Sequence, residues 1–351
     1  MKPHSPPDLA TSDRLDRSRP VVLVTGGAGY IGAHTCRQLH ATGYTPVVID
    51  NLTTGWASSV RWGPLERGDV RDKLFVDAMM RKYQPHAVFH FAALSVVAES
   101  MRKPAGYYHV NALGGLNLLQ SMSEYGVGHF ILSSSAAVYG EPETFPIPET
   151  HPTRPLNPYG QSKLFTEQMT HHIGRVGNIR HVILRYFNAA GADILGSLGE
   201  DHRPETHLIP LVLQAALESQ EPLHIFGADY DTPDGTCIRD YIHVNDLAEI
   251  HCRALKHLEE GGDSEIFNVG TGSGHSIMEI IELARKITQR KVTTIIGPRR
   301  SGDPSRLVAD SGKARQALNW HPRYSDLETI LATTWSWILK QHHQKRNQDQ
   351  H

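Results

Sequence analysis

Short apolar runs separated by longer amphipathic stretches dominate the first half of the chain. The apolar runs lie at residues 21–24, 47–49, 87–91, 129–132 and 181–184 and are rich in valine, isoleucine, leucine and phenylalanine. Runs of this length and composition predict strands that are buried on both faces. Helical patterns lie between them, including one that ends at Leu39, one at 117–125 and one from Pro158 to about His172. The alternation predicts an α/β fold built on a doubly wound parallel sheet.

A glycine-rich segment follows the first predicted strand. Residues 25–32 read TGGAGYIG, which places Gly26, Gly29 and Gly32 between a strand and a helix. In this context the glycines allow a tight turn, backbone approach to a pyrophosphate and close packing of the helix on the strand. The first amides of the helix then favour the phosphate charge. A glycine cluster alone also fits an ordinary loop, but the strand and helix around it predict a Rossmann-type dinucleotide site.

The second predicted strand ends at an acidic residue. Asp50 lies eighteen residues after Gly32. A carboxylate at this place accepts hydrogen bonds from the adenosine ribose and repels a 2′-phosphate, so NAD is favoured over NADP as the cofactor.

Composition narrows the classes of protein to consider. The chain has 351 residues and a formal net charge of -2, so no basic field favours nucleic acid. Its three cysteines lie far apart, which favours a reducing cytoplasm. No apolar stretch approaches the ~18–20 residues that span a bilayer, and the N-terminal segment lacks the apolar core of a secretory signal. We expect neither a nucleic-acid partner nor a membrane partner.

The chain is long enough for two lobes around one cofactor. We assign residues 21–188 to an NAD-binding domain, to which the chain returns around 236–260, and residues 189–340 mainly to a smaller C-terminal substrate-binding lobe. The polar segments 1–20 and 341–351 are expected to be a disordered N-terminal extension and a flexible tail.

A tyrosine and a lysine share one face of the helix that begins at Pro158. Asn157 suits the helix cap and Pro158 suits the first helical position, which places Tyr159 and Lys163 one turn apart. A free tyrosine has a pKa of ~10, and an ammonium nearby favours its phenolate. Lowering that pKa by about 3 units requires roughly 4 kcal/mol and produces a general base. The spacing alone also fits a surface aromatic packed on a lysine stem.

Three serines follow the predicted strand at 129–132. Because strand carboxyl ends face the ligand crevice in open α/β sheets, the hydroxyl of Ser135 can reach a substrate oxygen. Serine runs are also common in turns. Together with Tyr159, Lys163 and the glycine segment, Ser135 completes a candidate catalytic set.

From residue 21 to about 339, the sequence resembles the extended short-chain dehydrogenase/reductase family and, within it, the 4-epimerases of UDP-sugars. The motifs that carry the resemblance are TGGAGYIG (25–32), IDNL (49–52), HFAAL (90–94), SSSAAVYG (133–140), NPYGQSK (157–163), LRYFNAAGA (184–192), GEDHRPETHLIP (199–210), DGTCIRDYIHVNDLA (234–248) and PRRSGDPSRLVAD (298–310). The resemblance implies an NAD-dependent isomerase that interconverts UDP-glucose and UDP-galactose. Hydride leaves C4 of the sugar for tightly bound NAD, the 4-keto sugar rotates, and hydride returns to its opposite face.

The resemblance also implies roles for individual residues. Tyr159 takes the proton of the sugar 4-hydroxyl, Lys163 lowers its pKa and holds the nicotinamide ribose, and Ser135 hydrogen-bonds the same sugar oxygen. The implied NAD contacts are Gly26, Gly29, Tyr30, Ile31, Gly32, Asp50, Asn51, Asp69, Val70, Phe91, Ala92, Asn111, Lys163 and Phe187. The implied contacts to the UDP-sugar, besides Ser135 and Tyr159, are Asn188, His207, Leu208, Phe226, Arg239, Tyr241, Arg300, Asp303 and Leu307.

No metal ligand is expected. The 22 histidines form no HExxH motif and no Cys/His cluster, and hydride transfer to NAD needs no metal. Two other residues also fit a purely structural role. Asp246 suits the N-terminal cap of the helix that follows it, and Phe187 suits the hydrophobic core.

Some positions depart from the pattern of the family. Ser95 stands where some relatives have lysine and His207 where others have asparagine, which puts these ligand contacts in doubt. The intermediate size of Leu307 leaves N-acetylated sugars open. Ala136 and Ala137 stand where related dehydratases carry an Asp–Glu pair, which disfavours elimination of water.

Other functions stay open at this point. A UDP-pentose 4-epimerase, acting on UDP-xylose and UDP-arabinose, would share the whole mechanism. A redox-silent NAD-binding regulator is disfavoured because Ser135, Tyr159 and Lys163 are all present. A plain alcohol dehydrogenase would exchange free NAD. The resemblance further implies a homodimer built on the helices near Asn117 and Tyr159.

Overall fold

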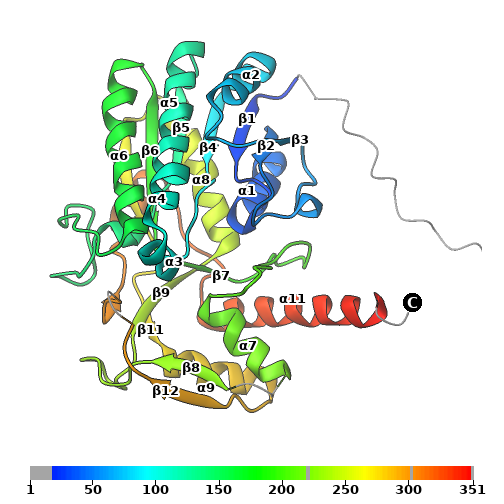
Figure 1. Ribbon diagram of the computed structural model, residues 1–351, viewed down its shortest axis with the longest axis vertical. Coiled ribbons are helices and arrows are strands. Elements are labelled where there is room, and N and C mark those ends of the chain that lie inside the picture. The colour runs from blue at the N-terminus through cyan, green and yellow to red at the C-terminus, as the bar shows by residue number, and fades with distance from the viewer. Residues whose placement is uncertain (1–17, 219–221, 301–302, 349–351) are drawn as a thin grey trace, which may run out of the picture.

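The computed structural model describes residues 18–218, 222–300 and 303–348. Within them, the larger lobe is a seven-stranded sheet of β1 (Val21–Thr25), β2 (Thr45–Asp50), β3 (Leu65–Arg67), β4 (Ala87–His90), β5 (His129–Ser133), β6 (Arg180–Tyr186) and β10 (Glu265–Val269). The strands are parallel and lie in the order β10-β6-β5-β4-β1-β2-β3 (Figure 1). This arrangement confirms the predicted Rossmann-type doubly wound α/β fold.

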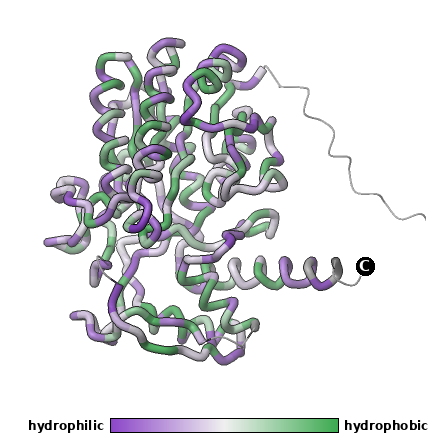
Figure 2. The backbone as a smooth tube through the Cα atoms, viewed as in Figure 1, coloured by the Kyte–Doolittle hydropathy of each residue, from purple (hydrophilic) through white to green (hydrophobic). Residues whose placement is uncertain are grey.

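Successive side chains of the central strands pack into two different cores. Val22 and Val24 lie in one core, against α1 (Tyr30–Ala41) and α8 (Val244–Glu259), whereas Leu23 lies in the other. That second core is covered by α2 (Lys73–Tyr83), α5 (Gly114–Tyr125) and α6 (Pro158–Val176). Because helices cover both faces, the strands are continuous apolar runs. Figure 2 shows both hydrophobic and hydrophilic segments on these helices, as helices with one buried side require.

The smaller lobe faces the carboxyl ends of the main strands (Figure 1). Its described strands are β7 (Asn188–Ala190), β9 (Ile238–His243), β11 (Gly274–Ser276) and β13 (Arg306–Leu307) in one sheet, and β8 (Leu223–Phe226) paired with β12 (Thr294–Gly297). Helices α7 (Leu208–Glu218), α9 (Ile277–Thr288) and α11 (Leu327–Gln348) enclose a separate apolar core. The shorter helices are α3 (Val97–Arg102), α4 (Pro104–Tyr107), a π-helical segment (Tyr108–Leu113) and α10 (Gly312–Ala317).

The predicted strands and helices all form, with ends that differ by a few residues. Two strands of the main sheet, β3 and β10, were not predicted. The segment 236–260 contains β9 of the smaller lobe and then α8, which packs on α1. The expected tail from residue 341 is helical as far as Gln348, and residues 1–17 of the expected extension lie outside the described residues. No helix in the described ranges has both the length and the apolar character needed to cross a membrane.

Candidate active site

The loop between β1 and α1 is shaped by its glycines. Gly26 has a φ of +72°, and a Cβ there would lie 2.5 Å from the backbone nitrogen of Ala92. A Cβ on Gly32 would lie 2.3 Å from the carbonyl oxygen of Gly26. Gly29 precedes α1 and has no side chain with which to cap it, so the first helical amides are available to an anion. The cradle therefore fits the pyrophosphate of a dinucleotide.

Asp50 closes this loop from the end of β2. Its carboxylate accepts hydrogen bonds from the amide of Ala28 at 3.0 Å and from the amide of Leu52 at 2.8 Å. Burial raises the pKa of Asp50, and the two amides act in the opposite direction. A carboxylate oxygen can accept more than one hydrogen bond, so Asp50 can also receive ribose hydroxyls.

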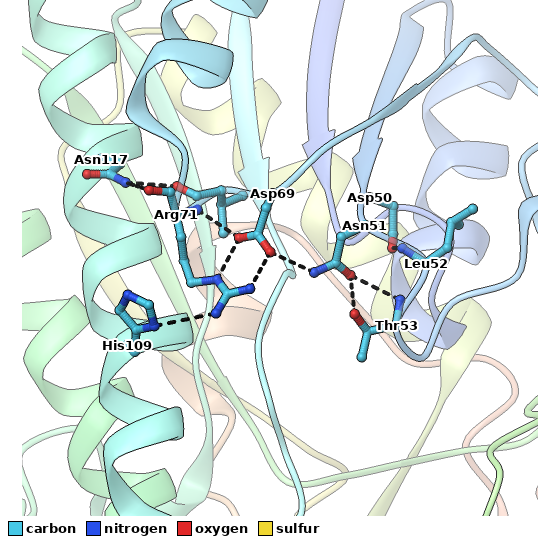
Figure 3. Close-up of polar contacts among 9 residues, drawn as sticks. Asp50, Asn51, Leu52, Thr53, Asp69, Arg71, His109 and Asn117 are labelled. Atoms are coloured by element: carbon cyan, nitrogen blue, oxygen red, sulfur yellow. Dashed lines mark hydrogen bonds and ion pairs between the residues drawn. The ribbon is translucent and has the colours of Figure 1, made fainter.

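A chain of polar contacts continues from the end of β2 (Figure 3). Asn51 donates to Asp69 at 2.9 Å, and Arg71 binds the same carboxylate through Nε at 2.9 Å and a terminal nitrogen at 2.7 Å. Arg71 holds the pKa of Asp69 well below its usual range. Asn117 donates to the carbonyl oxygens of Val70 and Arg71 and so fixes this turn. Arg71 lines the cavity described below but was not predicted. The sequence signal for this pair was an aspartate, Asp69, two positions before an arginine.

The serine and tyrosine of the predicted catalytic set meet at the start of α6. The side chain of Asn157 caps this helix by accepting a hydrogen bond from the amide of Gly160 at 2.9 Å. Tyr159 lies in the first turn, is 7% exposed and is hydrogen-bonded to Ser135. Ser135 is held in turn by the amide of Ala137, which donates to its hydroxyl at 3.1 Å. Burial raises the pKa of Tyr159, and the hydrogen bond with Ser135 lowers it.

Lys163 lies one helical turn further along α6 and is also buried. Its ammonium donates to the carbonyl oxygen of Ser133 at 2.8 Å. Burial lowers the pKa of Lys163 to about 8, and the carboxylate of Glu167 acts in the opposite direction. The lysine is therefore held at the carboxyl end of β5, on the same helix as Tyr159, with its charge poorly solvated.

A buried ion pair lies behind this set and was not predicted. Arg185 on β6 binds the carboxylate of Glu167 through Nε at 3.0 Å and a terminal nitrogen at 2.6 Å. Another nitrogen of Arg185 donates to the hydroxyl of Tyr139 at 3.1 Å, and Tyr139 donates to Asn268 on β10 at 2.6 Å. These contacts tie α6 to the edge of the sheet. The signal in the sequence was Glu167, four residues after Lys163.

The predicted uridine-diphosphate residues lie on the smaller lobe. Arg239 on β9 pairs with the carboxylate of Asp303 and donates to the carbonyl oxygen of Pro304 at 2.8 Å. The guanidinium carbon of Arg300 lies 3.9 Å from the centroid of the Phe226 ring. Two arginines and an aromatic ring at one end of a cleft suit an anionic phosphate group joined to a planar base.

A single cavity of about 1780 Å³ connects these regions. The predicted residues that line it are Gly26, Gly29, Tyr30, Ile31, Gly32, Asp50, Asn51, Asp69, Val70, Phe91, Ala92, Ser135, Tyr159, Lys163, Phe187, Asn188, His207, Leu208, Phe226, Arg239, Tyr241, Arg300, Asp303 and Leu307. Of the predicted residues, all of which the structure describes, Asn111 alone does not line it. Asn111 lies behind the wall, where it is hydrogen-bonded to the backbone of Leu94 and donates to Ser162 at 2.9 Å.

The loop before α7 brings four further titratable residues together. Glu200, His202, Glu205 and His207 each place one nitrogen or oxygen within 4.8 Å of the others. Burial alone would lower the pKa of His202, but hydrogen bonds and charge from Glu200 and Glu205 raise it to about 10. This group was not predicted, because its spacing of Glu-x-His-x-x-Glu-x-His matches neither an HExxH motif nor a Cys/His cluster.

A Rossmann-type sheet with a dinucleotide cradle and a tyrosine–lysine pair at its carboxyl edge defines an NAD-binding enzyme of the short-chain dehydrogenase/reductase type. The sequence profile of one family within this class matches residues 22–270. The chain belongs to the NAD dependent epimerase/dehydratase family.

Similar proteins agree with this assignment. The chain is 48% identical over 327 residues to a UDP-glucose 4-epimerase of Rhizobium meliloti (strain 1021). The aligned residues cover 93% of this chain and 98% of that protein. Among solved structures, it is similar to UDP-glucose 4-epimerase from Brucella ovis in complex with NAD, with a TM-score of 0.88, 48% identity and coverage of 90% and 98% of the two chains. It is also similar to the enzyme from Bifidobacterium longum in complex with NAD+ and UDP, with a TM-score of 0.87, 37% identity and coverage of 91% and 98%.

Proposed function

We propose that this protein is an NAD-dependent isomerase that interconverts UDP-glucose and UDP-galactose at C4 of the sugar. The observation that carries the proposal is one cavity lined by Ser135 and Tyr159 near a glycine cradle and by Arg239 and Arg300 on the smaller lobe. The similarity to UDP-glucose 4-epimerases over more than nine tenths of the chain supports the same activity. Bound NAD supplies the chemistry of taking hydride from C4 and returning it to the opposite face.

The catalytic roles are assigned to Tyr159 and Lys163 on α6 and to Ser135, two residues after the end of β5. Tyr159 takes the proton of the sugar 4-hydroxyl and gives it back when the sugar is reduced. Ser135, which is hydrogen-bonded to Tyr159, also contacts that sugar oxygen and holds it in place. The ammonium of Lys163 favours the phenolate of Tyr159, because an opposite charge nearby stabilises the ionised form. Asn111, predicted as an NAD contact, holds Ser162 and the backbone of Leu94 in place, and Leu94 lines the cavity.

The smaller lobe is assigned to nucleotide binding. Arg239 and Arg300 bind the diphosphate, Phe226 packs on the uracil ring, and Asp303 accepts ribose hydroxyls. Arg239 is already paired with Asp303, so the ligand shares these groups rather than meeting an unpaired charge. The sugar then lies toward Tyr159, between Asn188 and Leu307.

Incubation of the purified protein with UDP-galactose, without added NAD, tests the proposal. We expect UDP-glucose to form, because NAD retained by the protein is regenerated in each turnover. Proton NMR follows the conversion. UDP-arabinose run in parallel measures the preference for hexose over pentose, and Tyr159→Phe serves as the inactive control. Lack of conversion even with NAD supplied would overturn the activity, and a net absorbance change at 340 nm would indicate a dehydrogenase instead.

We infer that the protein is a homodimer in which α5 and α6 face the partner. Phe165 on α6 is 41% exposed and packs against Tyr108, with ring centroids 5.8 Å apart. An exposed aromatic side chain that packs on a half-buried one suits an interface. Light scattering after gel filtration should give twice the mass of one chain for the unaltered protein and one chain mass for Phe165→Asp. A single-chain mass for the unaltered protein would refute the dimer.

We place the protein in the cytoplasm. Its three cysteines, Cys36, Cys237 and Cys252, are buried free thiols, which suits a reducing compartment. Fractionation of its source cells, with activity measured in each fraction, would contradict this placement if the activity were found outside the cytoplasm.

A further inference from the structure

The loop before α7 gathers potential metal ligands over eight residues. The His/Glu cluster consists of Glu200, His202, Glu205 and His207. The Nδ1 atom of His202 lies 3.1 Å from an oxygen of Glu200 and 3.8 Å from an oxygen of Glu205. The Nδ1 atom of His207 is hydrogen-bonded to that same oxygen of Glu200 and lies 3.9 Å from that of Glu205. Two imidazole nitrogens and two carboxylate oxygens therefore converge on one point.

We propose that the His/Glu cluster binds one divalent transition-metal ion at the rim of the large cavity. Zinc binds histidine nitrogen and carboxylate oxygen at ~2.0–2.2 Å in tetrahedral geometry, which sets neighbouring ligand atoms about 3.4 Å apart. Three of the four nitrogen–oxygen distances between histidine and glutamate lie close to that value. Only the hydrogen bond between His207 and Glu200 must lengthen to admit the ion. Imidazole with carboxylate is a donor set that suits zinc and its neighbours rather than magnesium.

The two carboxylates of the cluster need positive charge beside them, which one divalent ion can supply. A divalent ion between neutral imidazoles balances the same two carboxylates with a single cation. The side chain of Glu200 is only 3% exposed, so its charge has little water to stabilise it and depends on a cation held in place.

The surroundings hold the cluster in position. The indole of Trp337 donates to the carbonyl oxygen of Glu200 at 2.9 Å, and the indole of Trp56 donates to that of Asp201 at 2.8 Å. A second, small cavity of about 20 Å³ is lined by His202, Asp201, Trp56 and His34. The Nε2 atom of His34 is buried and has no hydrogen-bond partner among the described residues. This volume holds about one water molecule, which can complete the coordination of an ion at His202.

Binding of a metal here would fix the loop that forms one edge of the cleft. His202, Glu205 and His207 line the large cavity, as do Gly29 and Tyr30 at the start of α1. The ion would therefore cross-link this loop over residues 200–207, and its occupancy would hold the loop in the conformation that lines the cavity. The site does not rest on the proposed epimerase activity.

Binding of Zn²⁺ to the purified protein tests the site. The protein keeps its bound nucleotide and is first treated with a chelator. We expect one zinc ion per chain by calorimetric titration and by metal analysis after gel filtration. Mg²⁺ should not bind comparably, because it requires octahedral oxygen ligands. Co²⁺ bound in place of zinc should give the visible absorption bands of a tetrahedral site.

Single variants locate the ion. His202→Asn removes one ligand without altering a predicted nucleotide contact, and should weaken Zn²⁺ binding about tenfold or more. Glu205→Gln should have the same effect. His275→Asn is the matched control, because His275 also faces a glutamate, Glu279 at 3.8 Å, but outside the cluster. The melting temperature without metal reports whether each variant folds.

Either of two results would overturn the proposal. One is the absence of stoichiometric zinc in the unaltered protein. The other is equal zinc affinity in the control and in the folded cluster variants. If His202→Asn does not fold, Glu205→Gln decides alone. Loss of zinc binding in the cluster variants, with UDP-sugar conversion measured separately, would establish the site whatever the outcome for the enzyme activity.

Discussion

The two sides of the cleft are built in different ways. On the side of the main sheet, Ser135, Tyr159 and Lys163 stand at the end of a strand and on the helix that covers it, and their partners belong to the same lobe. On the side of the smaller lobe, Arg239 stands on β9, but Arg300 and Asp303 come from the loop between β12 and β13. A catalytic set on regular elements keeps its geometry, whereas loops adapt to the ligand. Changes on the sheet side should therefore lower kcat, and changes on the loop side should raise KM.

The largest effect is expected for Tyr159→Phe. Loss of the phenol removes the general base, so kcat should fall about a thousandfold or more. Retained NAD and the melting temperature should change little, because the ring and its packing on Tyr107 remain. Tyr83→Phe is the matched control, since it deletes the same hydroxyl on α2, outside the cavity. Near-normal kcat in Tyr159→Phe would refute the assignment of the base.

Lys163→Met should have the next largest effect, about a hundredfold on kcat, because the phenol loses the charge that favours its ionised form. Without the ammonium, the pKa of Tyr159 rises. The rising limb of the pH–rate profile should therefore move to higher pH. Lys73→Met on α2 removes an ammonium of similar chemistry from a surface pair with Asp77 and should leave the profile unchanged. An unmoved profile for Lys163→Met, measured at saturating NAD, would show that the lysine does not tune the phenol.

The same difference between the two sides explains what the sequence could predict. The order of β1, glycine loop and α1 is local, so a contiguous pattern predicted it. In contrast, β3 has only three residues, and β10 pairs with β6 from about eighty residues away, so neither produced a local signal. Arg185 and Glu167 pair across the fold, and the sequence alone does not place the two side chains together.

The His/Glu cluster on the loop before α7 shows a second reason why the sequence did not predict part of the structure. Its four residues are close in sequence, but their spacing matches no familiar metal motif, and its geometry depends on two tryptophans from distant elements, Trp56 and Trp337. The predicted residues of the cavity were transferred from a family resemblance. Asn111 is the one transferred residue that does not line the cavity, and its side-chain amide donates to Leu94 and Ser162 behind the wall.

On the side of the smaller lobe, Arg239→Lys should raise KM for the UDP-sugar about thirtyfold while kcat changes little. Lysine keeps the charge but loses the planar fork that binds phosphate through two hydrogen bonds, and charged hydrogen bonds contribute roughly 1.5–3 kcal/mol. The control is Arg154→Lys, in the exposed pair with Glu143, which should leave KM unchanged. A fall in kcat as large as that of Lys163→Met would contradict the division between the two sides.

Asp50→Ala should weaken NAD about tenfold and reduce discrimination against NADP. The variant loses a ribose acceptor and the charge that repels a 2′-phosphate. It also releases the amides of Ala28 and Leu52, so part of the effect comes from the loop. Asp72→Ala is the control for the loss of a carboxylate that binds a backbone amide, because Asp72 caps α2 by accepting from the amide of Phe75 and lies outside the cavity. Equal preference for NAD in Asp50→Ala and the unaltered protein, measured by displacement titration, would exclude the proposed role.

The smallest effect concerns stability and pH. In the nucleotide-free chain, the pKa of Lys163 is about 8, below the 10.5 of an unperturbed lysine. Between these values the unfolded chain binds more protons than the folded chain, so this group makes the free energy of unfolding rise with pH.

Relative to Lys163→Met, the unaltered protein should therefore gain about 1 kcal/mol between about pH 8 and about pH 9. Urea unfolding of both nucleotide-free proteins at the two pH values measures the difference, and all other titrating groups cancel in the comparison. A constant difference would mean that Lys163 keeps its proton throughout this range. In that case the carbonyl oxygen at the end of β5 and Glu167 stabilise the ammonium as well as water does. Burial of Lys163 on the sheet side of the cleft would then not lower the free energy of unfolding.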